Sequence, residues 1–401
     1  MDNVEHLGEV DGILIGGDVA FKGDPDEYEA AQDWIGQLAD ACGCDLNSVF
    51  VVPGNHDVDQ RVIRSKVAVQ NAQSAIFNAH GNRLAVLTAQ LNDEQSGRSL
   101  FEPIAAYNDF AARYNCQVYP TDKIFWKQIR EFGDGVALRI FGLTSTLLSG
   151  QGAPRGERDN ESTLYLSPLQ TVLDPQEDTV TMVLSHHPPE WLLDRDDVND
   201  KINGRAHIQL FGHKHAGRIT REDGYLRVNA GAVNPDEGEL GWCPTYNFLD
   251  IQVEGEGRTR KIKIVTHILE WQQNPEGYRP RRSPQGADFF THEIAFPSRN
   301  RPASVAAPIR VVADEQPAHG GAAILSDTEA EMGRPDTRNL VIRFWKLNSS
   351  QRRSIARSLG LLEASEATLP EPERYGRALI RAGERNLLDE LQTQIENEER
   401  N

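Results

Sequence analysis

Four short polar segments of this chain carry residue types that bind divalent metals. They are Gly17-Asp18, Gly54-Asn55-His56-Asp57, Ser185-His186-His187 and Gly212-His213-Lys214-His215. Two metal ions held roughly 3.5–4 Å apart need ligands from several strands, including a carboxylate that touches both ions. Asp18 suits that bridge, because its neighbour Gly17 lets backbone and metal come close. Asn55 offers a neutral carbonyl oxygen.

The histidines narrow the choice of metal. Imidazole nitrogens, here from His186, His213 and His215, suit Mn, Fe, Zn or Ni better than Mg or Ca. Since His213 and His215 lie two residues apart, an extended segment would put both side chains on the same side, one for each ion. Each segment alone has a plainer interpretation, because such residues also form tight turns and strand ends. Together, the four segments indicate a metal site.

Each polar segment follows an apolar run that predicts a buried strand. The runs are Gly12-Ile13-Leu14-Ile15, Val49-Phe50-Val51-Val52, Met182-Val183-Leu184 and His207-Ile208-Gln209-Leu210-Phe211. Buried strands of this kind deliver ligands at their C-terminal edge. Between the first two runs, Asp24, Pro25 and Glu27 predict the start of a helix. Further strands are expected at 225–228, 246–253 and 260–270. Residues 1–271 therefore predict an α/β domain.

The order of these motifs resembles the calcineurin-like metallophosphoesterases over about residues 10–255. The resemblance implies a four-layer α/β/β/α sandwich, in which two packed β-sheets are flanked by helices. It implies five metal ligands: Asp18, Asn55, His186, His213 and His215. It also implies that His56 donates a proton and that Asp57 orients His56. The implied reaction is attack on phosphorus by a metal-activated hydroxide, with protonation of the departing alkoxide by His56.

The resemblance also distinguishes two adjacent histidines and suggests the cofactors. The family places a ligand at the position of His186, so we expect His187 to support the ligands from behind. Members of the family hold two divalent transition metals. We expect Mn, or else Fe, Zn or Ni, with at least one ion in this chain.

One motif of the family is missing. Family members open with Asp-x-His at the end of a first strand, and the residues before Asp18 contain no such motif. One metal would then keep Asp18, Asn55, His186 and His213, whereas the other would have only Asp18 and His215. Either the sequence starts at an internal methionine and lacks that strand, or the protein has one full metal site and weak or no hydrolytic activity. We favour the first explanation, because the neighbouring catalytic motifs are intact.

Composition argues against several classes of protein. The chain has 401 residues and a formal net charge of −18, which argues against a surface that binds nucleic acid indiscriminately. No apolar stretch approaches the roughly 18 residues of a membrane helix, and the N-terminus has no secretory pattern. We therefore expect no membrane contact and a cytoplasmic location. The four cysteines show no CxxC pairing, which argues against a disulfide framework or a zinc knot.

The C-terminal part of the chain differs from the rest. Residues 272–338 are rich in Pro, Gly, Ala, Arg and Ser and predict a linker, in which Phe289-Phe290 and 309–312 are open to interpretation as strands or docking segments. Residues 339–401 contain three helical patterns and predict a small all-α bundle. This bundle is similar to helical adaptor domains of bacterial conflict systems. A plain docking or oligomerising bundle is an equally good interpretation.

Two functions remain open. In the first, the chain is an enzyme that hydrolyses a phosphodiester of a nucleic acid or a nucleotide in a bacterial defence or signalling system. Its helical tail would bind a protein partner or a second copy. In the second, it is a catalytically impaired metal-binding scaffold or nucleotide sensor that acts through the tail. Residues 60–180 are expected to face the substrate, although aromatic residues there, such as Phe101 and Trp126, are more often core.

Overall fold

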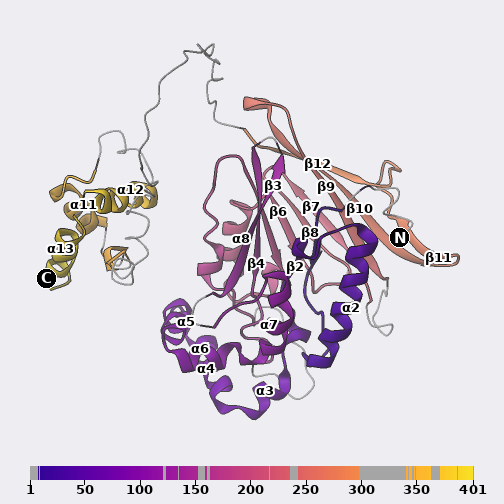
Figure 1. Ribbon diagram of the computed structural model, residues 1–401, viewed down its shortest axis with the longest axis horizontal. Helices are drawn as coiled ribbons and strands as arrows, with labels where there is room; N and C mark the ends of the chain where they lie inside the picture. Colours follow the sequence, from indigo (N-terminus) through magenta and orange to yellow (C-terminus); the bar gives the residue numbers. More distant parts are fainter. Residues whose placement is uncertain are drawn as a thin grey trace, which may run out of the picture. The chain divides into compact units, whose positions relative to one another are not determined.

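The computed structural model describes most of the chain. The described residues are 8, 10–120, 123–133, 135–151, 159, 163–215, 217–234, 243–297, 340–341, 343–345, 347, 349–362, 371–385 and 387–400. The chain divides into two compact units, Met1–Val305 and Ala306–Asn401. Figure 1 labels their helices and strands.

A six-stranded mixed sheet is the larger sheet of the first unit (Figure 1), with the order β3-β4-β5-β6-β8-β7. Its strands are β3 Phe125–Gly133, β4 Val136–Leu143, β5 Thr179–Ser185, β6 Ile208–Phe211, β7 Arg218–Glu222 and β8 Tyr225–Asn229. Strands β4, β5, β6 and β8 are parallel, and β3 and β7 pair antiparallel at the two edges. Because neighbouring parallel strands end at the same edge, the segments after β5 and β6 meet there.

Two short strands near the N-terminus form a parallel pair. They are β1 Ile13–Ile15 and β2 Val49–Val51, joined through helix α2 Pro25–Cys42. The helix begins as predicted, because Asp24 caps it and Glu27 completes a capping box. It ends at Gly43, which has a left-handed φ of 67°. The predicted strand-helix-strand unit is confirmed.

A second, four-stranded sheet follows in sequence. Its strands are β9 Thr245–Glu254, β10 Lys261–Gln273, β11 Glu276–Pro280 and β12 Phe290–Ala295. Strand β9 pairs with one edge of β10, and β11 and β12 share the other edge. The predicted linker is therefore wrong for residues 276–280 and 291–295, whose polar composition is that of edge strands held by a long neighbour. At Phe289-Phe290, where a strand was one of the open interpretations, β12 begins with Phe290. The segment 309–312 lies outside the described residues.

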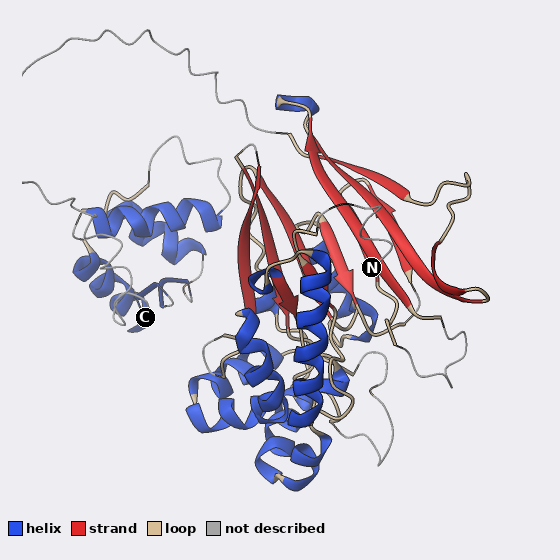
Figure 2. Ribbon diagram, turned by 45° about the vertical axis from the view of Figure 1, so that its right-hand side comes forward, coloured by secondary structure: helices blue, strands red, loops and turns tan. Residues whose placement is uncertain are grey.

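Helices gather at one end of the sheets in the first unit, as Figures 1 and 2 show. They are α3 Gln60–Ser65, α4 Val67–Asn78, α5 Arg83–Asn92, α6 Glu94–Phe101 and α7 Ala105–Ala111. Helix α8 Arg195–Asn203 lies between β5 and β6 in sequence. Aromatic residues of this region, among them Phe101, Tyr107 and Trp126, are buried in the core, as predicted. A buried aromatic side chain stabilises the fold by about 1.5–3 kcal/mol.

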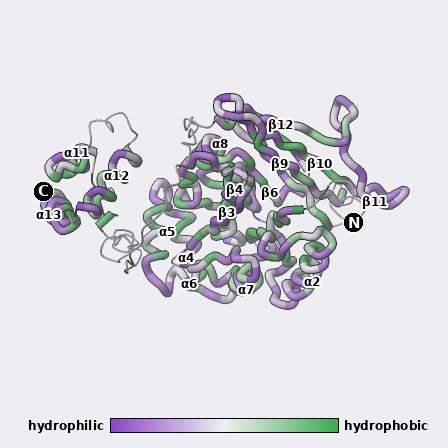
Figure 3. Tube along the Cα trace, turned by 45° about the horizontal axis from the view of Figure 1, so that its top comes forward, coloured by the Kyte–Doolittle hydropathy of each residue, from purple (hydrophilic) through white to green (hydrophobic). Residues whose placement is uncertain are grey.

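The core of the first unit is built from the strands that precede the polar motifs. Figure 3 shows hydrophobic residues along the central strands and alternating hydrophilic and hydrophobic turns in the helices. All residues of β2, β5 and β6 are buried. Buried strands leave little freedom to the residues that follow them, so the polar motifs have fixed positions.

The second unit is helical. Its longer helices are α11 Ser349–Ser358, α12 Glu371–Glu384 and α13 Leu388–Arg400. Phe344, Ile355, Tyr375 and Leu391 belong to its apolar core. The predicted fold class, an α/β part with C-terminal helices, is confirmed. Among the residues that the structure describes, no helix is both long and apolar enough to cross a bilayer.

Candidate metal centre

Four of the predicted ligands converge from the ends of four strands. Asp18 follows β1, Asn55 follows β2, His186 follows β5 and His213 follows β6. The Nε2 atom of His186 lies 3.2 Å from Oδ2 of Asp18, 3.1 Å from Oδ1 of Asn55 and 3.2 Å from Nδ1 of His213. The last two atoms lie 3.0 Å from each other.

The hydrogen bonds of His186 show what this group of atoms can bind. Its Nδ1 atom lies 2.7 Å from the carbonyl oxygen of Gly16, which can only accept, so Nδ1 carries a proton. In the neutral ring, Nε2 then points a lone pair at two oxygen acceptors, Oδ2 of Asp18 and Oδ1 of Asn55. Lone pairs that converge in this way repel one another unless a cation lies among them. Ligands about 2.1 Å from one ion and at right angles lie about 3 Å apart, so the group fits a divalent metal.

The pKa shifts of Asp18 and His186 agree with a site that stabilises a cation. Burial alone would raise the pKa of Asp18, but His186 and His56 hold it well below its ordinary value. Burial alone would lower the pKa of His186, but the Asp18 carboxylate raises it above its ordinary value. The carboxylate thus favours a cation at Nε2, which is the place where a metal would lie.

His187 lies beside the ligands in a buried position. Its ring and those of His186 and His213 bring potential ligand nitrogens within 4.8 Å of one another. Its Nδ1 atom lies 2.8 Å from Oγ of Ser145. Within the described part of the chain, its buried Nε2 atom has no hydrogen-bond partner. Burial and the two neighbouring histidines lower its pKa well below the ordinary value, so the ring is neutral, as a metal ligand must be.

The Gly-His-x-His segment does not have the predicted extended backbone. His213 and His215 have left-handed φ angles of 62° and 52°, so the expectation from two-residue spacing in a strand is wrong here. The strand ends at Phe211, and the loop after it turns back at each histidine. Burial, followed by the charges of His186 and His215 among its neighbours, lowers the pKa of His213 to about 3.

A close approach between two loops fixes Asp18. Asp18 has a left-handed φ of 55°, and its Oδ1 atom accepts a hydrogen bond of 2.9 Å from the backbone N–H of His56. A Cβ atom on Gly54 would lie 2.1 Å from that same Oδ1. Only glycine fits at position 54, so Gly54 is the residue that allows the loop after β1 and the loop after β2 to approach closely.

Asp57 is fully buried and links the two loops to α2. Its Oδ2 accepts from the backbone of Gly54 at 2.8 Å, and its Oδ1 accepts from Ala20 at 2.9 Å and from the Tyr28 hydroxyl at 2.9 Å. Burial and Asp18 raise its pKa to about 6, against the effect of these hydrogen bonds.

The resemblance implied that Asp57 orients His56, and the hydrogen bonds of Asp57 reach the backbone of the His56 loop at Gly54, the backbone of Ala20 and the Tyr28 hydroxyl. The Nδ1 atom of His56 faces the carbonyl oxygen of Phe21 at 3.0 Å, and the two rings stack with centroids 5.3 Å apart. Since a carbonyl only accepts, Nδ1 of His56 carries a proton, and Nε2 is left for proton transfer. Asp57 therefore holds the backbone of the loop at Gly54, and the carbonyl of Phe21 orients the His56 ring.

Several residues near the site had no signal in the sequence. Phe21 and Ser145 contact His56 and His187, as described above, and the Trp191 ring stands edge-on to His213 at 4.1 Å. Asp159 interacts electrostatically with His186 and Asp18, and its Oδ1 accepts from the backbone of Gly150 at 2.7 Å. These contacts are made between distant segments, so no local pattern marks them.

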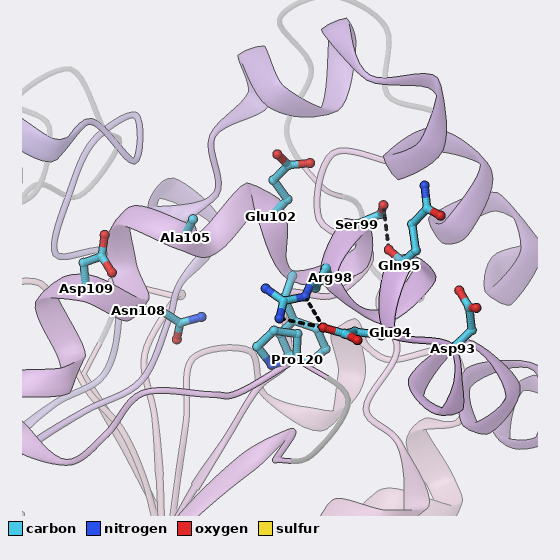
Figure 4. Close-up of a pocket in the computed structure, with 11 residues that line it drawn as sticks. Asp93, Glu94, Gln95, Arg98, Ser99, Glu102, Ala105, Asn108, Asp109 and Pro120 are labelled. Atoms are coloured by element: carbon cyan, nitrogen blue, oxygen red, sulfur yellow. Dashed lines mark hydrogen bonds and ion pairs between the residues drawn. The ribbon is translucent and has the colours of Figure 1, made fainter.

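The large hollow of the helical end is separate from the candidate metal ligands. That cavity measures about 820 Å³ and is lined by α6, α7 and Pro120 (Figure 4). Its charged groups include the ion pair of Arg98 with Glu94. None of its lining residues belongs to the four polar motifs.

The chain is similar to known proteins over both units. Residues 1–217 match the calcineurin-like phosphoesterase family, and residues 336–397 match the GTPase-associated adaptor domain. A metallophosphoesterase-like protein of Bacillus subtilis (strain 168), YydB, is 21% identical over 290 residues, which are 68% of this chain and 55% of that protein. A candidate 5′-nucleotidase of Staphylococcus aureus, solved with α-ketoglutarate, is 11% identical with a TM-score of 0.25, over 67% of this chain and 48% of that one.

This chain spans about half the length of each of these two proteins. The family match, in contrast, extends over more than half of this chain and includes all four polar motifs. The chain therefore belongs to the calcineurin-like phosphoesterase family.

Proposed function

We propose that this chain hydrolyses a phosphodiester of a nucleic acid or a nucleotide, in the cytoplasm, as part of a bacterial defence or signalling system. Membership in the family supports a metal-dependent phosphoesterase in general terms. The observation that carries the proposal is the convergence of Asp18, Asn55 and His213 on His186, whose Nε2 atom lies 3.1–3.2 Å from one side-chain atom of each.

Divalent transition metals are the proposed cofactors, with Mn first and Fe, Zn or Ni as alternatives. The four converging residues would hold one ion, and His215 would serve a second. Bound metal would neutralise charge on the phosphoryl oxygens and lower the pKa of a water molecule, so that hydroxide is available at neutral pH. The neutral ring of His187 would support the ligands from the buried side through its ring contacts, with centroids 4.6 Å from those of both His186 and His213.

The proposed proton donor is His56. Its Nδ1 proton is committed to the carbonyl of Phe21, which sets the direction of the ring and leaves Nε2 for the substrate. In hydrolysis a water molecule loses one proton and its oxygen joins phosphorus, while the bond between phosphorus and the leaving oxygen breaks. The leaving oxygen takes a proton from Nε2 of the imidazolium form of His56, which carries a proton on each ring nitrogen. Proton transfer by a positioned side chain contributes roughly 10²–10⁴-fold to the rate of such reactions. Asp57 keeps the loop of His56 in place.

The alternative is a metal-binding scaffold or nucleotide sensor with impaired catalysis. It is favoured by the ligand set itself, which is complete for one ion and leaves the other with Asp18 and His215. In both cases we propose that residues 339–401 form a domain that binds a protein partner or a second copy of the chain. The match of this region to an adaptor domain supports that role.

The experiment is hydrolysis of bis(p-nitrophenyl) phosphate in the presence of Mn²⁺. We expect turnover by the full chain, loss of turnover in Asp18→Ala and His213→Ala, and no change in His80→Ala, which removes an exposed histidine of the helical region. Metal content of each protein is measured in parallel. Retention of Mn²⁺ by the wild-type chain without turnover would support the scaffold and contradict the enzyme.

A further inference from the structure

Phe21 places a large apolar ring on the surface next to the proposed proton donor. The ring is 63% exposed, although burial of so large an apolar group would be favourable. It stacks on the ring of His56, with an interplanar angle of 24°. The carbonyl of the same residue accepts from Nδ1 of His56. Phe21 therefore meets His56 through both its backbone and its side chain.

Two carboxylates hold the loop that carries Phe21. The Oε2 atom of Glu27 accepts hydrogen bonds of 2.9–3.2 Å from the backbone N–H groups of Phe21, Lys22 and Asp24. The carboxylate of Asp57 accepts from those of Val19 and Ala20. The exposed position of the ring is thus fixed by the fold, because the backbone on both sides of it is bonded to acids that are themselves anchored.

The position of the ring matches the place of a leaving group. The leaving oxygen must reach Nε2 of His56, so the remainder of the leaving group lies beside that ring. Phe21 offers an open aromatic surface there, and the ammonium group of Lys22 lies 5.6 Å from the Phe21 ring centroid. An exposed aromatic ring flanked by a cation is a typical platform for a nucleobase of a single strand or a nucleotide.

We propose that Phe21 is the stacking platform for the leaving group of the substrate, and that this leaving group is a nucleoside. The inference rests on the proposed phosphodiesterase function and adds the substrate class. It predicts a preference for diesters whose leaving alcohol bears a planar aromatic ring over diesters of equal reactivity whose leaving alcohol has none.

The test compares three esters of thymidine 3′-phosphate that release the same product. The leaving alcohols are thymidine, 2-phenylethanol and methanol, which are all alkyl alcohols, and release of thymidine 3′-phosphate is followed by chromatography. We expect kcat/KM of the wild-type chain to be about tenfold higher for the thymidine ester than for the methyl ester, as stacking on one aromatic side chain implies. Phe21→Ala should bring that ratio close to one, while Phe21→Trp should keep it.

Each outcome decides between explanations. A wild-type ratio near one, or an equal ratio in the wild type and Phe21→Ala, overturns the platform while leaving the phosphodiesterase function intact. Acceleration with 2-phenylethanol as well as thymidine supports a platform for aromatic groups in general, and acceleration with thymidine alone supports recognition of the base. Trp34→Ala, which removes an aromatic ring that is 48% exposed on α2, is the matched control and should keep the wild-type ratio.

A binding measurement decides the case if no ester is turned over. Thymidine is titrated into the metal-free chain and followed by saturation-transfer NMR. We expect a signal with the wild type and the Trp34→Ala control, and a loss of about tenfold in affinity in Phe21→Ala. Equal binding by the wild type and Phe21→Ala would overturn the platform, whereas binding lost only in Phe21→Ala with no turnover would contradict the proposed enzyme alone.

Discussion

Replacement of Asp57 with alanine removes the group that holds three segments of the site together. One carboxylate oxygen accepts from the backbone of Gly54 at 2.8 Å and of Val19 at 3.3 Å. The other accepts from the backbone of Ala20 and from the Tyr28 hydroxyl, both at 2.9 Å. The donors belong to the loop after β1, the loop after β2 and helix α2, so a single substitution loosens all three.

The magnitude follows from the donors that would lose their acceptor. A buried donor left unpaired costs about 1–3 kcal/mol. The bond from Val19 is long and only partly buried, so three donors count, and together they cost about 3–9 kcal/mol. Water that enters the space would satisfy part of this, so we expect a loss of about 4 kcal/mol, a large share of the roughly 5–15 kcal/mol that stabilises a folded protein. Tyr28→Phe removes one donor and should cost about 1.5 kcal/mol.

Hydrogen exchange followed by mass spectrometry measures this loss at the site. The exchange rate of peptides that contain β2 reports local opening of the first unit, so unfolding of the C-terminal unit does not contribute to it. We expect Asp57→Ala to raise the exchange rate of these peptides about 10³-fold and Tyr28→Phe about tenfold. Asp40→Ala, which removes an exposed acid of α2, should leave the rate unchanged. The reasoning is refuted by a change in Asp57→Ala that is no larger than the change in Tyr28→Phe.

Two further predictions test the packing of the site loop and a buried histidine. In Gly54→Ala, the new Cβ would lie 2.1 Å from Asp18 Oδ1. We therefore expect Asp18 to be displaced and the Mn²⁺ affinity, measured by calorimetry, to fall at least about tenfold. Gly36→Ala on α2 is the control and should keep the affinity, because its Cβ would meet no atom within 4 Å. Burial, with Arg139, lowers the pKa of His207 to about 4, and its Nδ1 accepts from the backbone of Thr181 at 3.0 Å. Because the pKa of His207 in the folded protein is below the ordinary 6.5, its contribution to the free energy of unfolding is fully present above pH 6.5. This contribution is lost as the pH falls towards 4, and it amounts to roughly 2 kcal/mol after allowance for partial exposure. His207→Asn should make this part of the curve of unfolding free energy against pH less steep, with the remaining slope due to His187 and His213, whose pKa values are also lowered. An unchanged slope would contradict the assignment.

The parts of the site that follow strands could be predicted from the sequence, and the parts that depend on contacts between distant segments could not. Asp18, Asn55, His186 and His213 each come after a short apolar run, so local pattern predicted their position at strand ends, and the family resemblance selected them as ligands. The left-handed turns at His213 and His215 override the spacing argument, because two-residue periodicity holds only while the chain stays extended.

The errors in the fold have a similar cause. Strands β11 and β12 carry the polar residues of sheet edges, and only their pairing with β10 makes them strands, so their composition predicted a linker. Phe21 orients His56 through its backbone carbonyl. Every residue has such a carbonyl, so the residue type could not predict this contact. The link between Asp57 and Tyr28 spans 29 residues, beyond any local motif.

The central claim is that Asp18, Asn55, His186 and His213 form a metal site, and Mn²⁺ binding to the full chain tests it most directly. Free Mn²⁺ is followed by electron paramagnetic resonance as metal-free protein is titrated with the ion, for the wild type, His186→Ala and the control His80→Ala. The proposed geometry predicts about one or two tightly bound ions per chain in the wild type and the control. It predicts loss of the tight site in His186→Ala, and equal tight binding by the wild type and His186→Ala would contradict the claim.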